Sequence, residues 1–234
     1  MKSPIIQQLI ETTERYGSKI ALVDYPGVAG GEPSGRMQPR STTYDELYRN
    51  ARLVASYILN AGISPQRFIT IELPASMEFV AAQLGDWLAR CVSAPVGIDF
   101  PEQRKAFIRQ HCDSALHIDF SLMQTMLMGD TCGEVSIPEE SDNALLIYTS
   151  GSTGNPKGIL HDHRSVMSPM MLLQQSLSPT PADRYASYVH SYFIVELSYM
   201  VLIFGTEVHI IPMDVAKDVG ALAAYHRDHA VTLA

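Results

Sequence analysis

Residues 144–158 read ALLIYTSGSTGNPKG, and they are the most informative part of the 234-residue chain. The apolar run 144–148 is typical of a strand buried on both faces. Glycines, hydroxyl side chains and one lysine, Lys157, follow it directly. Glycine lets the backbone approach a ligand closely, hydroxyl groups donate hydrogen bonds to phosphate oxygens, and lysine adds positive charge. The stretch therefore predicts a buried strand that leads into a phosphate-binding loop.

This loop differs from the loop of P-loop nucleoside triphosphatases. Their motif has glycine directly before the lysine and serine or threonine directly after it, whereas Pro156 and Gly158 flank Lys157. The sequence therefore argues against a P-loop hydrolase. A flexible Gly/Ser connection is also disfavoured, because it predicts neither Pro156 nor the apolar strand before the loop.

Strands and helices alternate on both sides of the loop, which predicts an α/β fold with layered, mostly parallel sheets and flanking helices. We expect no internal repeat and no division into two domains. The expected strands are residues 20–25, 68–73, 93–98, 144–148 and 207–211. The expected helices are residues 4–16, 44–61, 77–90, 101–110, a segment from about residue 164, and 215–229.

Two helix starts have local signals. Ser3 and Pro4 are suited to the N-cap and the first helical position, and Gly17 to the end of that helix. Thr43 and Glu46 have the spacing of a capping box. Residues 26–40, rich in Gly and Pro, predict a surface loop.

Composition narrows the function classes. The net charge of −8 opposes binding to nucleic acids, and 46% hydrophobic residues suit a large core. The longest apolar stretch near 199–204 is too short to cross a bilayer, so we expect no membrane partner. Cys91, Cys112 and Cys132 form no CxxC pair, which predicts buried free thiols and a cytoplasmic location.

The extended stretch LLIYTSGSTGNPKGILHDHRSV (residues 145–166) resembles the signature of the adenylate-forming, or AMP-binding, superfamily. This superfamily includes acyl- and aryl-CoA ligases, adenylation domains of nonribosomal peptide synthetases and D-alanine carrier-protein ligases. Residues 42–59 (TTYDELYRNARLVASYIL) are also similar to the superfamily. Residues 89–118 (ARCVSAPVGIDFPEQRKAFIRQHCDSALHI) most resemble its peptide-synthetase and D-alanine ligase branch.

The resemblance implies a function and its cofactors. ATP, with Mg²⁺, would activate a small carboxylic acid as an acyl-adenylate, and the acyl group would pass to the thiol of CoA or of a phosphopantetheinyl carrier protein. His163 and Arg164 match the continuation of the motif, where capping or packing is the expected role. The residues implied to bind the ATP phosphates are Thr149, Ser150, Gly151, Ser152, Thr153, Gly154 and Lys157.

No metal site is expected from the histidines. His161 and His163 lie two residues apart, but no third ligand is evident. His226 and His229 meet the same objection, and a solvated helix face is the expected explanation for them.

The resemblance also places the acid-binding pocket, with His190, Tyr192 and Glu196 as its candidate residues. Amino-acid-activating members pair the substrate ammonium with an aspartate, and the position counted back from Gly205 holds Tyr192 instead. Because a buried ammonium without an anion is costly, an acid without an α-ammonium group is favoured. Glu196 keeps the alternative open, an amino-acid-activating domain of the peptide-synthetase or D-alanine ligase type.

The later motifs of the superfamily, including the catalytic lysine of a small C-terminal domain, do not occur up to Ala234. We therefore expect residues 1–234 to be part of the large N-terminal domain, with the C-terminal small domain absent and the catalytic residues unknown. A fragment of this kind is expected to be inactive alone and to self-associate through exposed apolar surface. A non-catalytic nucleotide-binding module is the second alternative.

Overall fold

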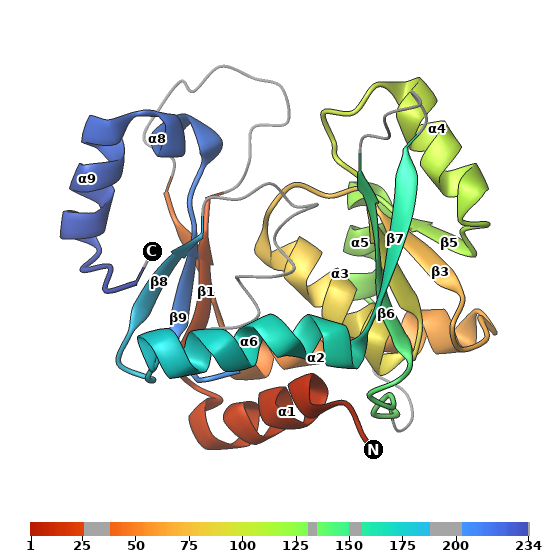
Figure 1. Ribbon diagram of the computed structural model, residues 1–234, viewed down its shortest axis with the longest axis horizontal. Coiled ribbons are helices and arrows are strands. Elements are labelled where there is room, and N and C mark those ends of the chain that lie inside the picture. Colours follow the sequence, from red (N-terminus) through yellow and green to blue (C-terminus); the bar gives the residue numbers. More distant parts are fainter. Residues whose placement is uncertain (26–37, 131–134, 150–155, 188–202, 234) are drawn as a thin grey trace.

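The computed structural model describes residues 1–25, 38–130, 135–149, 156–187 and 203–233 (Figure 1). Two sheets lie on either side of a layer that contains α2 and α3. The four-stranded sheet has the order β2-β1-β9-β8 and the five-stranded sheet β5-β3-β4-β6-β7. Their strands are β1 Ile20–Asp24, β2 Arg40–Thr43, β3 Phe68–Ile71, β4 Val92–Pro95, β5 Leu116–Ile118, β6 Asn143–Thr149, β7 Lys157–Asp162, β8 Arg184–Ser187 and β9 Glu207–Ile210.

Most neighbouring strands are parallel, and the antiparallel pairs are β1 with β2 and β6 with β7. This confirms the predicted α/β fold with mostly parallel sheets. The described helices are α1 Pro4–Tyr16, α2 Tyr44–Asn60, α3 Met77–Leu88, α4 Glu102–His111, α5 Phe120–Leu127, α6 His163–Leu177, α8 Met213–Lys217 and α9 Val219–Asp228.

One large core joins the two sheets. Leu22 of β1 and Val208 of β9 belong to the same buried cluster as Ile69 of β3 and Trp87 of α3. The outer face of the five-stranded sheet packs on α4 through a separate cluster that includes Ile108. Smaller clusters under single helices are the usual companions of one contiguous core.

The predicted helix starts are confirmed, but one of them lacks the expected side-chain cap. Thr43 and Glu46 form the expected reciprocal capping box at α2. Pro4 opens α1, but the Ser3 side chain makes no capping hydrogen bond and its Oγ lies 3.2 Å from His163 Nδ1 instead. Gly17 ends α1 in a right-handed conformation, with φ of −49°. A left-handed backbone conformation is therefore not the reason for a glycine at the end of this helix.

The prediction of one helix over residues 215–229 is wrong, because two helices occupy this region. The Asp218 carboxylate accepts hydrogen bonds from the backbone N–H groups of Gly220 and Ala221, at 2.8 and 2.9 Å. This N-cap starts α9 directly after α8. An aspartate at an N-cap favours a new helix over continuation of the previous one.

Several short elements were not predicted: β2, β5, α5, β7 and β8. Arg40, expected in the loop 26–40, opens β2, and residues 26–37 lie outside the described residues. Leu233, near the end of the described residues, forms one isolated parallel bridge with Tyr185 of β8.

Cys91 and Cys112 are buried free thiols, as predicted, while Cys132 lies outside the described residues.

Within the described part of the chain, every helix is too short or too polar to cross a bilayer.

Candidate phosphate-binding site

The root of the predicted phosphate loop is a hairpin of β6 and β7. Thr149, the last residue of β6, lies directly opposite Lys157, the first residue of β7. Directly opposite residues of an antiparallel pair place their side chains on the same face. Both residues are exposed, and Lys157 makes no ion pair with any residue that the structure describes. The hairpin root therefore presents one hydroxyl and one unpaired cation side by side.

The face that carries Thr149 and Lys157 is turned toward the four-stranded sheet. Side chains alternate along β6, and Leu145 and Ile147 pack into the core shared by both sheets. Leu146 and Tyr148 pack on the opposite face, against α4. Thr149 continues the series of Leu145 and Ile147. It lies at the carboxyl end of β6, the edge at which open α/β sheets bind ligands.

Tyr148 anchors the hairpin root to α4. Its hydroxyl lies 2.8 Å from His111 Nδ1, the two rings meet edge to face, and Phe107 stacks on His111. Burial raises the pKa of Tyr148, and the neighbouring Cys112 adds to this shift. Gly158 stands opposite Tyr148, where a Cβ would lie 3.0 Å from Leu146 Cδ1. The outer side of β6 is thus packed on α4 at Tyr148, whereas β7 is exposed from Lys157 to Leu160.

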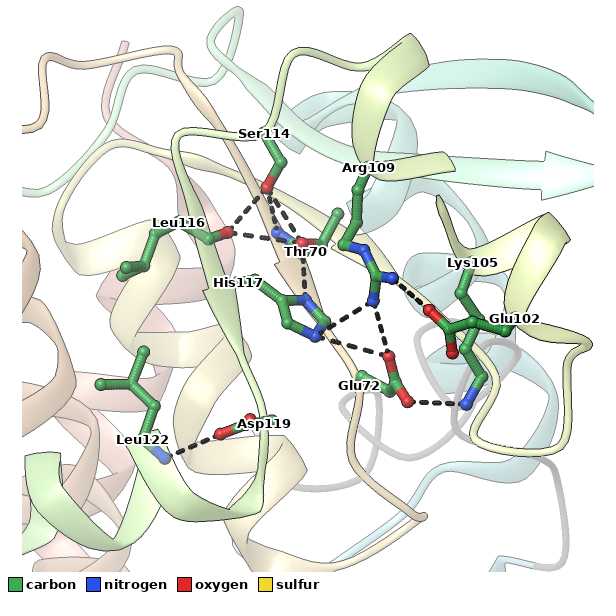
Figure 2. Close-up of polar contacts among 10 residues, drawn as sticks. All are labelled: Thr70, Glu72, Glu102, Lys105, Arg109, Ser114, Leu116, His117, Asp119 and Leu122. Atoms are coloured by element: carbon green, nitrogen blue, oxygen red, sulfur yellow. Dashed lines mark hydrogen bonds and ion pairs between the residues drawn. The ribbon is translucent and has the colours of Figure 1, made fainter. Parts of the chain in front are cut away.

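A polar cluster lies beside the carboxyl ends of β3 and β5 (Figure 2). Glu72 accepts hydrogen bonds from Lys105 at 2.7 Å and Arg109 at 3.2 Å, and His117 Nε2 lies 3.4 Å away. Burial lowers the pKa of His117, and Arg109 lowers it further. Sequence reasoning missed this cluster, because Lys105 and Arg109 have the pattern of a solvated helix face. Both cations are neutralised by carboxylates, whereas Lys157 has no carboxylate partner within the ranges that the structure describes.

The predicted packing role of His163 is confirmed. Its ring is 1% exposed and meets Trp87 edge to face. Burial lowers its pKa from 6.5 to about 4, so the ring is neutral at neutral pH. Arg164 pairs with Glu140 at 2.6 Å. Among the described residues no group of three or more His, Cys, Asp or Glu side chains has the arrangement of a metal site.

The interpretation of His229 as part of a solvated helix face is wrong. Its ring stacks on Tyr225 with centroids 4.1 Å apart, and its Nε2 lies 3.4 Å from the Tyr25 hydroxyl. The C-terminal end of α9 lies against the four-stranded sheet, which half-buries the ring.

Apart from Thr149 and Lys157, every predicted phosphate-binding and pocket residue lies outside the described residues. These are Ser150, Gly151, Ser152, Thr153 and Gly154 of the loop, and His190, Tyr192 and Glu196 of the proposed pocket. Of the predicted phosphate-binding set, the structure brings together Thr149 and Lys157.

Comparison with known families gives a match to the AMP-binding enzymes over residues 9–132 and 124–234. The chain belongs to the AMP-binding enzyme family. This confirms the resemblance of residues 145–166 to the superfamily signature.

The AMP-binding chain is similar in sequence to peptide synthetases. It is 27% identical to surfactin synthase subunit 1 of Bacillus subtilis over 251 residues, which covers 97% of this chain and 7% of the synthase. Tyrocidine synthase 2 of Brevibacillus parabrevis is 26% identical over 245 residues, covering 97% of this chain and 6% of that protein. The chain therefore corresponds to a small part of these proteins.

Solved structures share the fold of this AMP-binding chain. The Klebsiella oxytoca NpsA N-terminal subdomain in complex with 3-hydroxyanthranilyl-AMSN has a TM-score of 0.81 at 23% identity, covering 100% of this chain and 59% of that one. The peptide synthetase FmoA3 (S1046A) in its AMPPNP-bound form has a TM-score of 0.82 at 22% identity, covering 99% and 25%. These similarities confirm the fold class.

Proposed function

We propose that the chain is the nucleotide-binding part of an AMP-forming acid–thiol ligase, and that residues 1–234 form part of its large N-terminal domain. In the reaction, a carboxylate oxygen attacks the α-phosphorus of ATP and the bond to pyrophosphate breaks. A thiol of CoA or of a carrier protein then attacks the acyl carbon, and AMP leaves. The free thiols Cys91 and Cys112 suit a reducing compartment, so we place the protein in the cytoplasm.

The hairpin root is the observation that carries this proposal. Thr149 and Lys157 lie opposite each other at the carboxyl edge of a mostly parallel sheet. Adenylation aligns crowded anions and neutralises the charge that moves onto pyrophosphate, which is work for a preorganised cation and hydroxyl donors. These residues fit a phosphate group. Mg²⁺ is expected to arrive with the triphosphate, because the described residues offer it no acidic cluster.

For the acid, we propose a substrate without an α-ammonium group, aliphatic or aryl, with Tyr192 in the pocket where an aspartate would pair with an ammonium. The NpsA subdomain has been solved with 3-hydroxybenzoyl-AMSN, whose acyl part is aromatic. The similarity to peptide synthetases favours the alternative, an amino acid paired with Glu196. ATP–pyrophosphate exchange by the full-length protein, with aryl, aliphatic and amino acids in parallel, separates the two.

Calorimetric titration of the chain with Mg·ATP tests the nucleotide site. Lys157→Ala removes one charge-assisted hydrogen bond, worth about 1.5 to 3 kcal/mol, so the affinity should fall by roughly tenfold or more. Lys217→Ala is the matched control, because Lys217 is exposed on α8 and lies far along the chain from the hairpin. Equal affinity of the Lys157 and Lys217 variants would contradict the phosphate role of Lys157.

A further inference from the structure

The face of α3 that packs on the five-stranded sheet carries two polar side chains, Gln83 and Asp86. Both residues are 0% exposed. The Ser93 hydroxyl of β4 donates a hydrogen bond of 2.8 Å to Asp86 Oδ2. Trp87 donates from Nε1 to the Ala144 carbonyl oxygen of β6, also at 2.8 Å. Since Gln83 precedes Asp86 by three residues and Trp87 by four, it lies on this same face of the helix.

Three atoms of this pair lack a hydrogen-bond partner among the residues that the structure describes: Asp86 Oδ1, Gln83 Oε1 and Gln83 Nε2. Buried polar groups of native proteins are nearly always hydrogen-bonded, because an unpartnered one has lost its hydration without replacement. A direct bond between the two side chains would satisfy two of the three atoms at most. The site therefore requires a further molecule with hydrogen-bonding groups.

The chemistry of the two side chains defines that molecule. Burial raises the pKa of Asp86 well above its usual range, which favours the carboxylic acid form, and that form can donate a hydrogen bond. A primary amide and a carboxylic acid together offer donors and acceptors but no net charge. A metal cation would need ionised or more numerous oxygen ligands. Complete burial restricts the occupant to a small molecule, and water fits because it both donates and accepts and commonly bridges buried polar groups.

We propose that Gln83 and Asp86 form an internal water-binding site between α3 and β4, in which at least one long-lived water molecule bridges Asp86 Oδ1 and the Gln83 amide. Ser93 fixes the carboxyl group by holding its other oxygen. Gln83 and Asp86 lie on α3 and Ser93 on β4, next to β6 but outside the β6–β7 hairpin itself.

Oxygen-17 relaxation dispersion, which counts long-lived internal water molecules, tests the proposal on the chain itself. The double variant Gln83→Leu/Asp86→Leu should lose at least one such water relative to the wild type. It should still fold, since it replaces both unpartnered side chains at once by apolar groups of similar size and leaves the Ser93 hydroxyl as the one group that loses its acceptor. Thr13→Val is the control, because Thr13 is buried but already donates to the Leu9 carbonyl oxygen, at 2.9 Å. It should leave the count unchanged.

An unchanged count in the folded double variant would overturn the proposal. A crystal structure of the wild type provides a second readout that depends on no variant. Electron density for a water within hydrogen-bond distance of both Asp86 Oδ1 and the Gln83 amide would support the site. A metal ion at this position, or side chains that find other protein partners there, would overturn it.

Infrared spectroscopy tests the protonation of Asp86. The carbonyl band of a protonated carboxylic acid should be present at neutral pH and should disappear in Asp86→Asn. Absence of this band from the wild type would contradict a neutral Asp86.

Discussion

His163 should make the stability of this protein depend on pH in a window set by its burial. The imidazole is 1% exposed, and burial lowers its pKa from 6.5 to about 4. Below pH 6.5 the unfolded chain binds a proton at this residue that the folded chain does not bind. The stabilisation is therefore complete above pH 6.5 and is lost as the pH falls toward 4.

The magnitude follows from the width of the window. Each unit of pKa difference corresponds to about 1.4 kcal/mol, so lowering the pH from 7.5 to 5 should remove about 2 kcal/mol from the free energy of unfolding through His163 alone. This is a large part of the 5–15 kcal/mol that is typical of a folded domain.

Urea unfolding at pH 7.5 and pH 5 measures the effect, with the wild type compared with His163→Gln. The variant should lose about 2 kcal/mol less than the wild type over this interval, because glutamine does not titrate there. His161→Gln is the control, since His161 lies two residues away on β7 and is only partly buried. If the wild type and His163→Gln lost equal stability, the buried neutral imidazole would not be the cause.

Two further substitutions test hydrogen bonds that join different elements of the fold. Asp24 is buried at the end of β1 and accepts from Arg40 at 3.0 and 3.1 Å and from the Met77 backbone N–H at 2.9 Å. Asp24→Ala removes these hydrogen bonds to a buried carboxyl group, while Arg40 is 41% exposed and keeps its pair with Glu78, so the free energy of unfolding should fall by about 1.5 to 3 kcal/mol. Arg67→Ala, at the exposed pair with Asp113, should cost at most about 1 kcal/mol, and equal losses of the two variants in urea unfolding would refute this. Tyr148→Phe removes one hydrogen bond to His111 and should cost about 0.5 to 1.5 kcal/mol in the same assay; an unchanged midpoint would show that this bond does not hold the hairpin root.

The elements predicted correctly from the sequence are those with a strong local signal. The capping box of Thr43 and Glu46 and the apolar run of β6 each depend on residues close together in the chain, and both were confirmed. Strands such as β5 and β8, of three and four residues, are too short for a period of two to be recognised. The break at Asp218 was missed because apolar residues continue on both sides of it.

The candidate site could be predicted only in part for a different reason. The loop composition indicated Lys157 and Thr149, but their opposition depends on β7, and glycine-rich sequence hides a strand that begins at the lysine itself. The cluster around Glu72 brings together residues up to 45 positions apart, from Glu72, directly after β3, to His117 of β5. Only tertiary structure makes them neighbours.

The pairing of Thr149 with Lys157 also bears on the entropy of loop closure. Thr149 and Lys157 face each other across one inter-strand spacing. The β6–β7 ladder fixes this distance in the absence of any ligand. Bringing the ends of a flexible segment together carries an entropic cost that grows with the logarithm of its length. Folding of the β6–β7 ladder has already met that cost at Thr149 and Lys157, so the proposed nucleotide site would not draw it from the binding free energy of the ligand.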